Sequence, residues 1–258
     1  MIGRSLERRP VAASGTTGAV ALEVKGLSCS DLFRDISFRL HAGEVVGMYG
    51  LIGAGRTEIA ETIFGLRTSD AGEIRIDGEV VEITSPPEAI RHGIALAPES
   101  RKEQGLVLNM NCRDNMSLAQ LEGVSRTGWL DRSAEQAIYD DYADRLALKS
   151  PSWRTPVVNL SGGNQQKVVL GKWLSTKPRI LIVDEPTRGI DVGSKSEIHA
   201  LIRRLAASGI AVLVISSEMP EVLGVSDRIL ALYHGRLAAE FDAASVTEDA
   251  LVQAISGM

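Results

Sequence analysis

The chain has 258 residues, of which 44% are hydrophobic, and a formal net charge of −5 at pH 7. A chain of this length can bury a large core without disulfides or metals, and it favours one core with an inserted lobe over two equal domains. The mildly acidic composition gives no electrostatic footprint for nucleic acid, so no nucleic-acid partner is expected. Apolar runs such as residues 210–215 have strand length, far short of the roughly 20 residues that cross a bilayer.

The cysteines and histidines are scattered along the chain. Cys29 and Cys112 have no paired spacing, so we expect them to be packing residues in a reduced, cytosolic setting. The four histidines suggest no metal cluster. Residues 1–18 are polar and lack the apolar core of a signal peptide, so they are expected to form a flexible leader or linker ahead of a domain at residues 19–258.

Alternating apolar and polar residues begin the folded part of the sequence. They predict antiparallel strands at residues 20–24 and 36–40, which form a small β-layer. A short apolar strand at 44–49 and a helix at 57–64 follow, with a glycine-rich loop between them. A hairpin, a short helix and a further strand are then predicted at residues 74–78, 86–92 and 94–97.

The pattern becomes helical from about residue 102 to 177 and predicts an inserted helical lobe, with polar breaks at 123–128 and 149–156. Strands and helices then alternate again. The strands are predicted at 179–183, 210–215 and 228–233, and the helices at 194–207, 220–224 and 247–255. This alternation is typical of an α/β protein whose mainly parallel sheet is covered on both faces.

The glycine-rich loop between the strand at 44–49 and the next helix has the context of a phosphate-binding loop. Its glycines allow backbone N–H groups to approach phosphate oxygens at a helix N-terminus, and Thr57 can offer a hydroxyl to Mg²⁺. Arg56 stands where a lysine is expected. A plain glycine-rich turn is the alternative. The candidate nucleotide-binding residues here are Gly50, Leu51, Ile52, Gly53, Ala54, Gly55, Arg56, Thr57 and Glu58.

Two adjacent carboxylates follow the apolar run at 180–183. Asp184 is expected at the carboxyl end of a buried strand, where it can hold Mg²⁺. Glu185 is placed to orient or deprotonate an attacking water, a role typically worth about 10²–10⁴ in rate. A carboxylate that caps the next segment is the alternative, and the glycine-rich loop argues against it.

A Ser-Gly-Gly turn opens the segment Leu-Ser-Gly-Gly-Asn-Gln-Gln-Lys at residues 160–167. Such a turn at a helix start offers a hydroxyl and unobstructed N–H groups to an anion, although a simple helix N-cap would use the same residues. With the apolar strand and carboxylates at 180–185, this segment resembles the signature and Walker B motifs of ABC transporter ATP-binding domains. The resemblance covers roughly residues 20–240.

Within that superfamily, the segments at 50–58, 184–191 and 216–221 resemble the second ATPase half of bacterial monosaccharide importers of the ribose, galactose and xylose type. The resemblance implies a P-loop NTPase core with an N-terminal antiparallel β-layer and an inserted helical lobe. It also implies ATP and Mg²⁺ as cofactors, and a position on the cytoplasmic face of the bacterial inner membrane. The implied partners are a second ABC ATPase domain, membrane permease subunits and, indirectly, a periplasmic sugar-binding protein.

In that family two ATPase domains form a head-to-tail sandwich with ATP between the loop of one and the signature of the other. Ser161, Gly162 and Gly163 would then contact a nucleotide held by the partner domain, and Asp191 would lie in the loop that crosses between the sites. The first residues, Met-Ile-Gly-Arg, resemble the boundary that follows a first ATPase domain in tandem proteins, so the chain is expected to be a fragment or a separately made second half.

The sequence departs from the general ABC pattern at several positions. Arg56 replaces the loop lysine, and a planar guanidinium cannot occupy the place of a compact ammonium without shifting phosphate contacts. Ser217, a candidate catalytic position with Glu185, stands in place of a switch histidine. Glu99 replaces the glutamine that couples nucleotide to the membrane subunit. Second halves of sugar importers typically show replacements of these kinds.

Two nearby positions are also unusual. Ser100 departs from the family's usual Pro-Glu-Asp-Arg-Lys segment. Phe33 is the one aromatic residue near the position of the expected adenine-stacking side chain. The sequence is equally consistent with Phe33 as a core residue.

These observations favour an ATP-binding half that couples MgATP binding and hydrolysis to import of a simple sugar, with an impaired Arg56 loop and weak or partner-dependent ATPase activity. A non-hydrolytic scaffold that presents its signature to a partner ATPase domain is the alternative. A soluble ABC ATPase of DNA repair or translation fits the composition less well.

Overall fold

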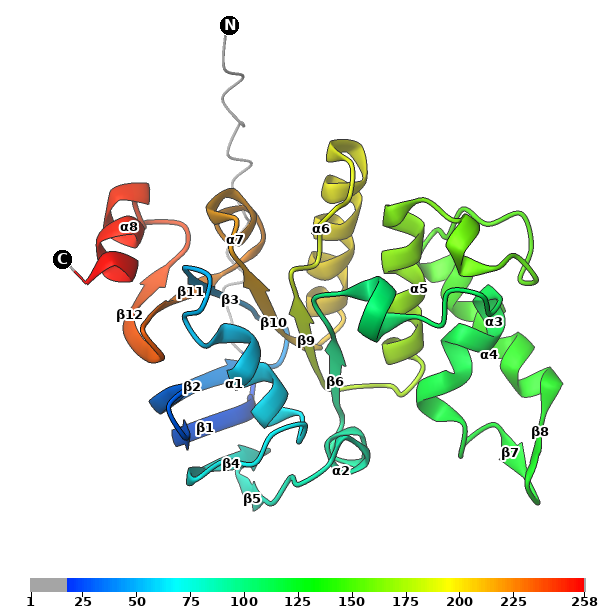
Figure 1. Ribbon diagram of the computed structural model, residues 1–258, viewed down its shortest axis with the longest axis horizontal. Helices are drawn as coiled ribbons and strands as arrows, with labels where there is room; N and C mark the ends of the chain where they lie inside the picture. The colour runs from blue at the N-terminus through cyan, green and yellow to red at the C-terminus, as the bar shows by residue number, and fades with distance from the viewer. Residues whose placement is uncertain (1–17, 258) are drawn as a thin grey trace, which may run out of the picture.

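The computed structural model describes residues 18–257, so the predicted leader lies outside the described residues except for Gly18. Figure 1 shows two β-sheets with their helices next to a mainly helical part drawn in green. The strands of the two large sheets are β1 (Val20–Cys29), β2 (Phe33–His41), β3 (Val45–Gly50), β4 (Ala71–Ile76), β5 (Glu79–Val81), β6 (Ile94–Ala97), β9 (Ile180–Asp184), β10 (Ala211–Ser216), β11 (Arg228–Tyr233) and β12 (Arg236–Asp242).

Eight α-helices accompany these strands within residues 18–257. They are α1 (Arg56–Ile63), α2 (Pro86–Arg91), α3 (Cys112–Ser117), α4 (Arg132–Arg145), α5 (Gly162–Leu174), α6 (Val192–Ala207), α7 (Met219–Val225) and α8 (Glu248–Ser256). Short turns of other helical types are η1 (Arg101–Gly105), η2 (Leu118–Gln120) and η3 (Val157–Asn159). None of the helices described combines the length and apolarity needed to cross a membrane.

The predicted N-terminal antiparallel layer is present as a sheet in the order β2-β1-β4-β5. Leu22 pairs with Leu40 of β2 and with Ile76 of β4. β1 is longer than the strand predicted at 20–24, because the ladder shifts register near Gly26 and then continues to Cys29. The shift interrupts the alternation on which the prediction depended.

The second sheet carries the candidate site at its carboxyl edge. Its strand order is β12-β11-β3-β10-β9-β6, in which only β12 is antiparallel to its neighbour. Every residue of β3, β9 and β10 is buried, as near-continuous apolar runs require in a sheet covered on both faces. Because Ile215 pairs with both Asp184 and Met48, these three strands end side by side. The predicted α/β fold is confirmed.

The helical part contains one element that the sequence reading missed. A two-stranded hairpin, β7 (Ser125–Arg126) and β8 (Trp129–Leu130), lies where a polar break was predicted. Thr127 and Gly128 both have positive φ, so they form the two-residue turn that suits a tight hairpin. The strands are too short to show a period of two in the sequence. Treatment of residues 102–177 as a separate lobe stays a prediction.

Three clusters of buried side chains hold the elements together. One joins the antiparallel sheet to α1 and the main sheet, a second lies between the main sheet, α5 and α6, and a third lies under α7 and α8. Phe33 is 1% exposed in the first cluster, which agrees with the core interpretation of this residue and leaves it no open face for a base. Cys29 and Cys112 are buried packing residues, as predicted.

Candidate nucleotide-binding site

The glycine-rich loop turns from β3 into α1 with its tip in solvent. Gly53 and Gly55 have φ values of 82° and 89°, which favour glycine over other residues. Leu51 and Ile52 are exposed between them. The helix begins at Arg56, one residue before the predicted start, and its N-cap Gly55 has no side-chain cap. The first N–H groups of α1 are therefore available to an anion.

Two predicted magnesium ligands meet beneath this loop. The Thr57 hydroxyl donates to Oδ2 of Asp184 at 2.7 Å, although the two residues are 127 positions apart. The Asp184 side chain is 2% exposed, and no donor among residues 18–257 reaches its Oδ1. Burial raises the pKa of Asp184 to about 6, and the Thr57 hydrogen bond opposes that rise. An unpartnered buried carboxylate oxygen beside a hydroxyl fits one Mg²⁺ that keeps most of its other ligands as water or phosphate.

Glu185, the residue after Asp184, contacts two neighbouring residues. Its Oε1 accepts the backbone N–H of Ser217 at 2.8 Å and lies 3.5 Å from Nη1 of Arg56. Both side chains of the ion pair are about one-tenth exposed. Glu185 also has a φ of 46°, a conformation that non-glycine residues rarely adopt. The residue that replaces the loop lysine therefore contacts the candidate catalytic carboxylate directly.

A buried polar network anchors the segment that follows Glu185. The Thr187 hydroxyl donates to Oε1 of Glu221 at 2.8 Å, and Nε2 of His199 lies 2.7 Å from the same oxygen. Burial alone would raise the pKa of Glu221, but hydrogen bonds from His199, Ser216 and Thr187 outweigh it and leave the pKa below its usual value. The histidine thus supports the site from α6, a role the sequence did not reveal.

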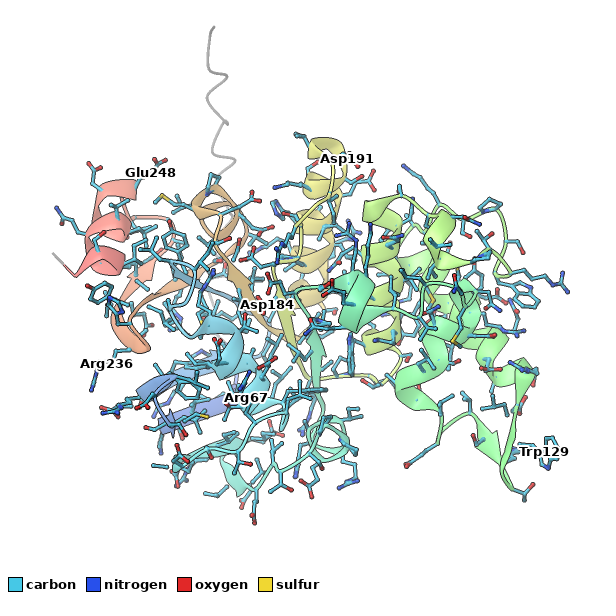
Figure 2. The ribbon with its side chains drawn as sticks, viewed as in Figure 1. Arg67, Trp129, Asp184, Asp191, Arg236 and Glu248 are labelled. Carbon is cyan, nitrogen blue, oxygen red and sulfur yellow. The ribbon has the colours of Figure 1, made fainter. Side chains whose placement is uncertain are left out.

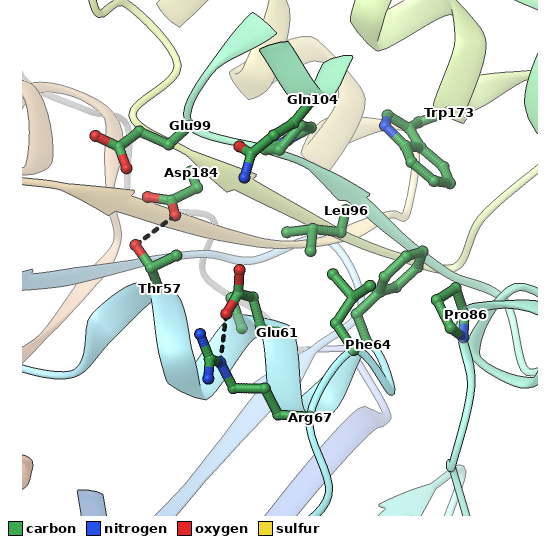
Figure 3. Close-up of a pocket in the computed structure, with 13 residues that line it drawn as sticks. Thr57, Glu61, Phe64, Arg67, Pro86, Leu96, Glu99, Gln104, Trp173 and Asp184 are labelled. Atoms are coloured by element: carbon green, nitrogen blue, oxygen red, sulfur yellow. Dashed lines mark hydrogen bonds and ion pairs between the residues drawn. The ribbon is translucent and has the colours of Figure 1, made fainter. Parts of the chain in front are cut away.

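A cavity of about 580 Å³ extends from Thr57 and Asp184 toward α2 and α5. Figure 3 shows Thr57 and Asp184 at one end of it and Pro86 and Trp173 at the other. The predicted coupling residue Glu99 lies on the wall nearest the magnesium pair. Its carboxylate is paired with the Arg188 side chain, a partner that the sequence reading did not identify.

The signature residues lie apart from the loop. Ser161 is the N-cap of α5 and accepts from Nδ2 of Asn164 at 2.9 Å, while Gly162 and Gly163 form the first turn. Asp191 is the N-cap of α6 and is labelled at the end of that helix in Figure 2. Within the described residues, no hydrogen bond joins these four residues to the loop at 50–57. The two candidate segments are therefore not joined directly by hydrogen bonds in the described part of the chain.

The family model described as "ABC transporter" matches residues 33–188, more than half of the chain and including the loop, signature and strand-end carboxylates. The chain belongs to the ABC transporter family. The resemblance to ABC ATP-binding domains is thereby confirmed.

Several family members match the whole of this chain. The ribose import ATP-binding protein RbsA of Jannaschia sp. is 47% identical over 258 residues, which are 100% of this chain and 50% of that protein. The RbsA protein of Geobacillus kaustophilus is 46% identical over 257 residues, 100% of this chain and 52% of that protein. The chain therefore spans about half the length of these relatives.

Solved ABC structures share the fold at low sequence identity. A nucleotide-free ATP-binding cassette has a TM-score of 0.77 at 20% identity, covering 92% of this chain and 95% of that one. A bacterial Atm1-family ABC exporter with ATP bound has a TM-score of 0.72 at 23% identity, covering 96% of this chain and 44% of that one. These likenesses support the ABC ATPase architecture alone.

Proposed function

We propose that this chain is one ATP-binding half of a monosaccharide importer of the ribose type, most similar in motifs to the second half. The full-chain match to proteins named ribose import ATP-binding proteins supports the substrate class. Its partners are then a second ABC ATPase domain and membrane permease subunits on the cytoplasmic face of the inner membrane, with a periplasmic sugar-binding protein acting indirectly. The leader at 1–18 and the lobe at 102–177 belong to this proposal.

The two half-sites have different roles in this proposal. The loop at 50–58 binds one MgATP, with Thr57 and Asp184 holding the ion that neutralises phosphate charge. Ser161, Gly162 and Gly163 contact the nucleotide in the partner's loop, with Asp191 in the segment that crosses between the sites. Glu99 couples the nucleotide to the permease. Separate half-sites in one chain make ATP turnover dependent on a partner.

The Arg56–Glu185 ion pair is the observation that supports an impaired loop. The Glu185 carboxylate lies 3.5 Å from the Arg56 guanidinium, so a water that approaches this carboxylate competes with an ion-pair partner already in place. The same contact directs the guanidinium toward Glu185. Ser217, in the place of the switch histidine, reaches Glu185 through its backbone N–H. Hydrolysis at this loop is therefore slow.

Arg56→Lys tests the impaired loop in the assembly of this chain with a partner ATPase domain and the permease. The shorter reach and compact charge of lysine should weaken the contact with Glu185, so we expect single-turnover hydrolysis at this loop to rise by about tenfold or more. Arg67→Lys is the matched control, since that arginine pairs with Glu61 outside the phosphate loop. An unchanged rate in Arg56→Lys would contradict the assigned role of the ion pair.

A non-hydrolytic scaffold is the second candidate function. Arg56 and Ser217 favour it, and the intact Asp184–Glu185 pair argues against it. In the same single-turnover assay, Glu185→Gln abolishes residual turnover at this loop if the loop is a slow ATPase. If the loop is a scaffold, Glu185→Gln changes nothing while loss of Ser161 still stops turnover at the partner's loop.

A further inference from the structure

Arg101 lies where two segments of the candidate site meet. It is the first residue of η1. Its guanidinium donates through Nη1 to the carbonyl oxygen of Arg188, through Nη2 to that of Gly189 at 2.9 Å, and through Nε to Oε1 of Gln165 at 3.3 Å. One side chain therefore joins the loop that follows β9 to helix α5.

These contacts are made at the first turn of α5. The Gln165 side chain is 4% exposed, and its Nε2 donates onward to the Val157 carbonyl at 3.1 Å. Gly162 leaves room for the guanidinium, because a Cβ there would lie 2.9 Å from Nη2 of Arg101 and 3.1 Å from the Gly189 carbonyl oxygen. The signature turn thus packs between the Arg101 guanidinium and the carbonyl oxygen of residue 189.

The contacts require the shape of a guanidinium. All three acceptors are neutral oxygens, and no carboxylate in the described range 18–257 forms an ion pair with Arg101. A rigid fork can reach two consecutive carbonyls and an amide together, whereas a lysine ammonium is a single point charge. The neighbouring Glu99–Arg188 pair is more exposed and, like most surface ion pairs, contributes little to stability.

We propose that Arg101 is a positioning residue for ATP hydrolysis: it holds the signature turn at 161–163 in register with the loop at 188–191. The signature then meets the partner's nucleotide with its hydroxyl and N–H groups aligned. Since η1 begins two residues after Glu99, the same guanidinium links the signature to the proposed coupling segment. The inference rests on the proposed function, because the nucleotide concerned is the one in the partner's loop.

Arg101→Lys and Arg101→Ala test this role in the assembled transporter. Both should lower kcat for MgATP by about tenfold to a hundredfold, because small misplacements of positioning groups have effects of that size. KM for MgATP should change by less than about twofold, since the partner's loop still binds the nucleotide. Lys102→Ala is the control, because Lys102 is an exposed neighbour in η1.

Hydrogen exchange in the chain alone gives a second readout. Arg101→Lys should speed exchange at residues 159–165 and 187–191 and leave β3 and β10 unchanged. Full activity in Arg101→Lys, or a kcat loss accompanied by faster exchange throughout the chain, overturns the proposal. Ser161→Ala separates the two inferences: if it leaves turnover in the assembly unchanged, the proposed function fails, whereas the exchange result still tests the Arg101 contacts.

Discussion

At the scale of single residues, the candidate site is a small group of neighbouring charged side chains. Asp184 lies buried with one oxygen unpartnered, and Glu185 beside it is paired with Arg56. Burial favours the neutral form of Asp184, whereas a bound cation favours its ionised form. The nucleotide-free chain therefore keeps an unfavourable buried charge that Mg²⁺ binding would relieve.

Asp184→Asn should stabilise the nucleotide-free chain at pH 8. The pKa of Asp184 is raised to about 6 in the folded chain, so the buried side chain is favourable while it is protonated. Its contribution to the free energy of unfolding is therefore present below about pH 4 and is lost as the pH rises through about 6. A shift of about two units corresponds to roughly 3 kcal/mol as an upper bound, because each unit is worth 1.36 kcal/mol. Chemical denaturation at pH 8 and at pH 4 measures the free energy of unfolding of the variant and of the wild type. The two values should differ at pH 8 and become nearly equal at pH 4.

The same variant should lose the dependence of its melting temperature on added MgCl₂ and ATP. Asp191→Asn is the matched control, because asparagine is an equally good N-cap for α6. Equal stability of Asp184→Asn and wild type at pH 8 would contradict the assigned burial effect.

At the scale of secondary-structure elements, helices α5 and α6 begin against each other without room for another side chain. A Cβ added at Gly163 would lie 2.7 Å from Cβ of Ser194 in the first turn of α6. Asp191 caps that turn by accepting the Ser194 N–H at 3.0 Å. Gly163 is therefore needed for the packing of α5 against α6.

Gly163→Ala should lower the free energy of unfolding by about 1–3 kcal/mol, the usual effect of overpacking. The double variant Gly163→Ala, Ser194→Gly removes the clashing atoms and should recover most of that loss in a urea titration. Gly193→Ala is the control, because its added Cβ meets only Oδ1 of Asp191 at 3.4 Å. A single variant as stable as the wild type would show that the two helices can separate freely at this point.

At the scale of the whole molecule, Trp173 is one of the side chains that connect the helical part to the sheets. Trp173, near the end of α5, packs against both of the large core clusters. Its ring meets Phe64 at the end of α1 edge-on, with centroids 5.3 Å apart. Both rings line the cavity that extends from Thr57 and Asp184. Movement of the helical part would therefore change the shape of this cavity.

A double-mutant cycle with Phe64→Leu and Trp173→Leu should give a coupling free energy of about 0.5–1.5 kcal/mol, as for other edge-on aromatic pairs. Denaturant unfolding of the four proteins measures it. Trp129→Leu should have no effect, because that ring is 81% exposed at the tip of the β7–β8 hairpin. Coupling below about 0.3 kcal/mol would mean that the edge-on contact between these two rings does not stabilise the protein.

Most of the fold could be predicted because its signals are local. Continuous apolar runs predicted β9 and β10, and alternation predicted the antiparallel layer, with errors where a register shift or a two-residue turn broke the pattern. The loop and signature were recognisable because glycine and serine have conformational and capping roles that depend on a few neighbours.

The sequence by itself determined the family, since the motifs that identify it are short contiguous segments. Tertiary structure alone decided which side chains meet: Arg56 with Glu185, Thr57 with Asp184, and Arg101 with residues 188 and 189. The physical reason is the register of the parallel strands, which brings together residues separated by 127 and 129 positions. Side-chain reach then selects the partners, and no local pattern in the sequence records that choice.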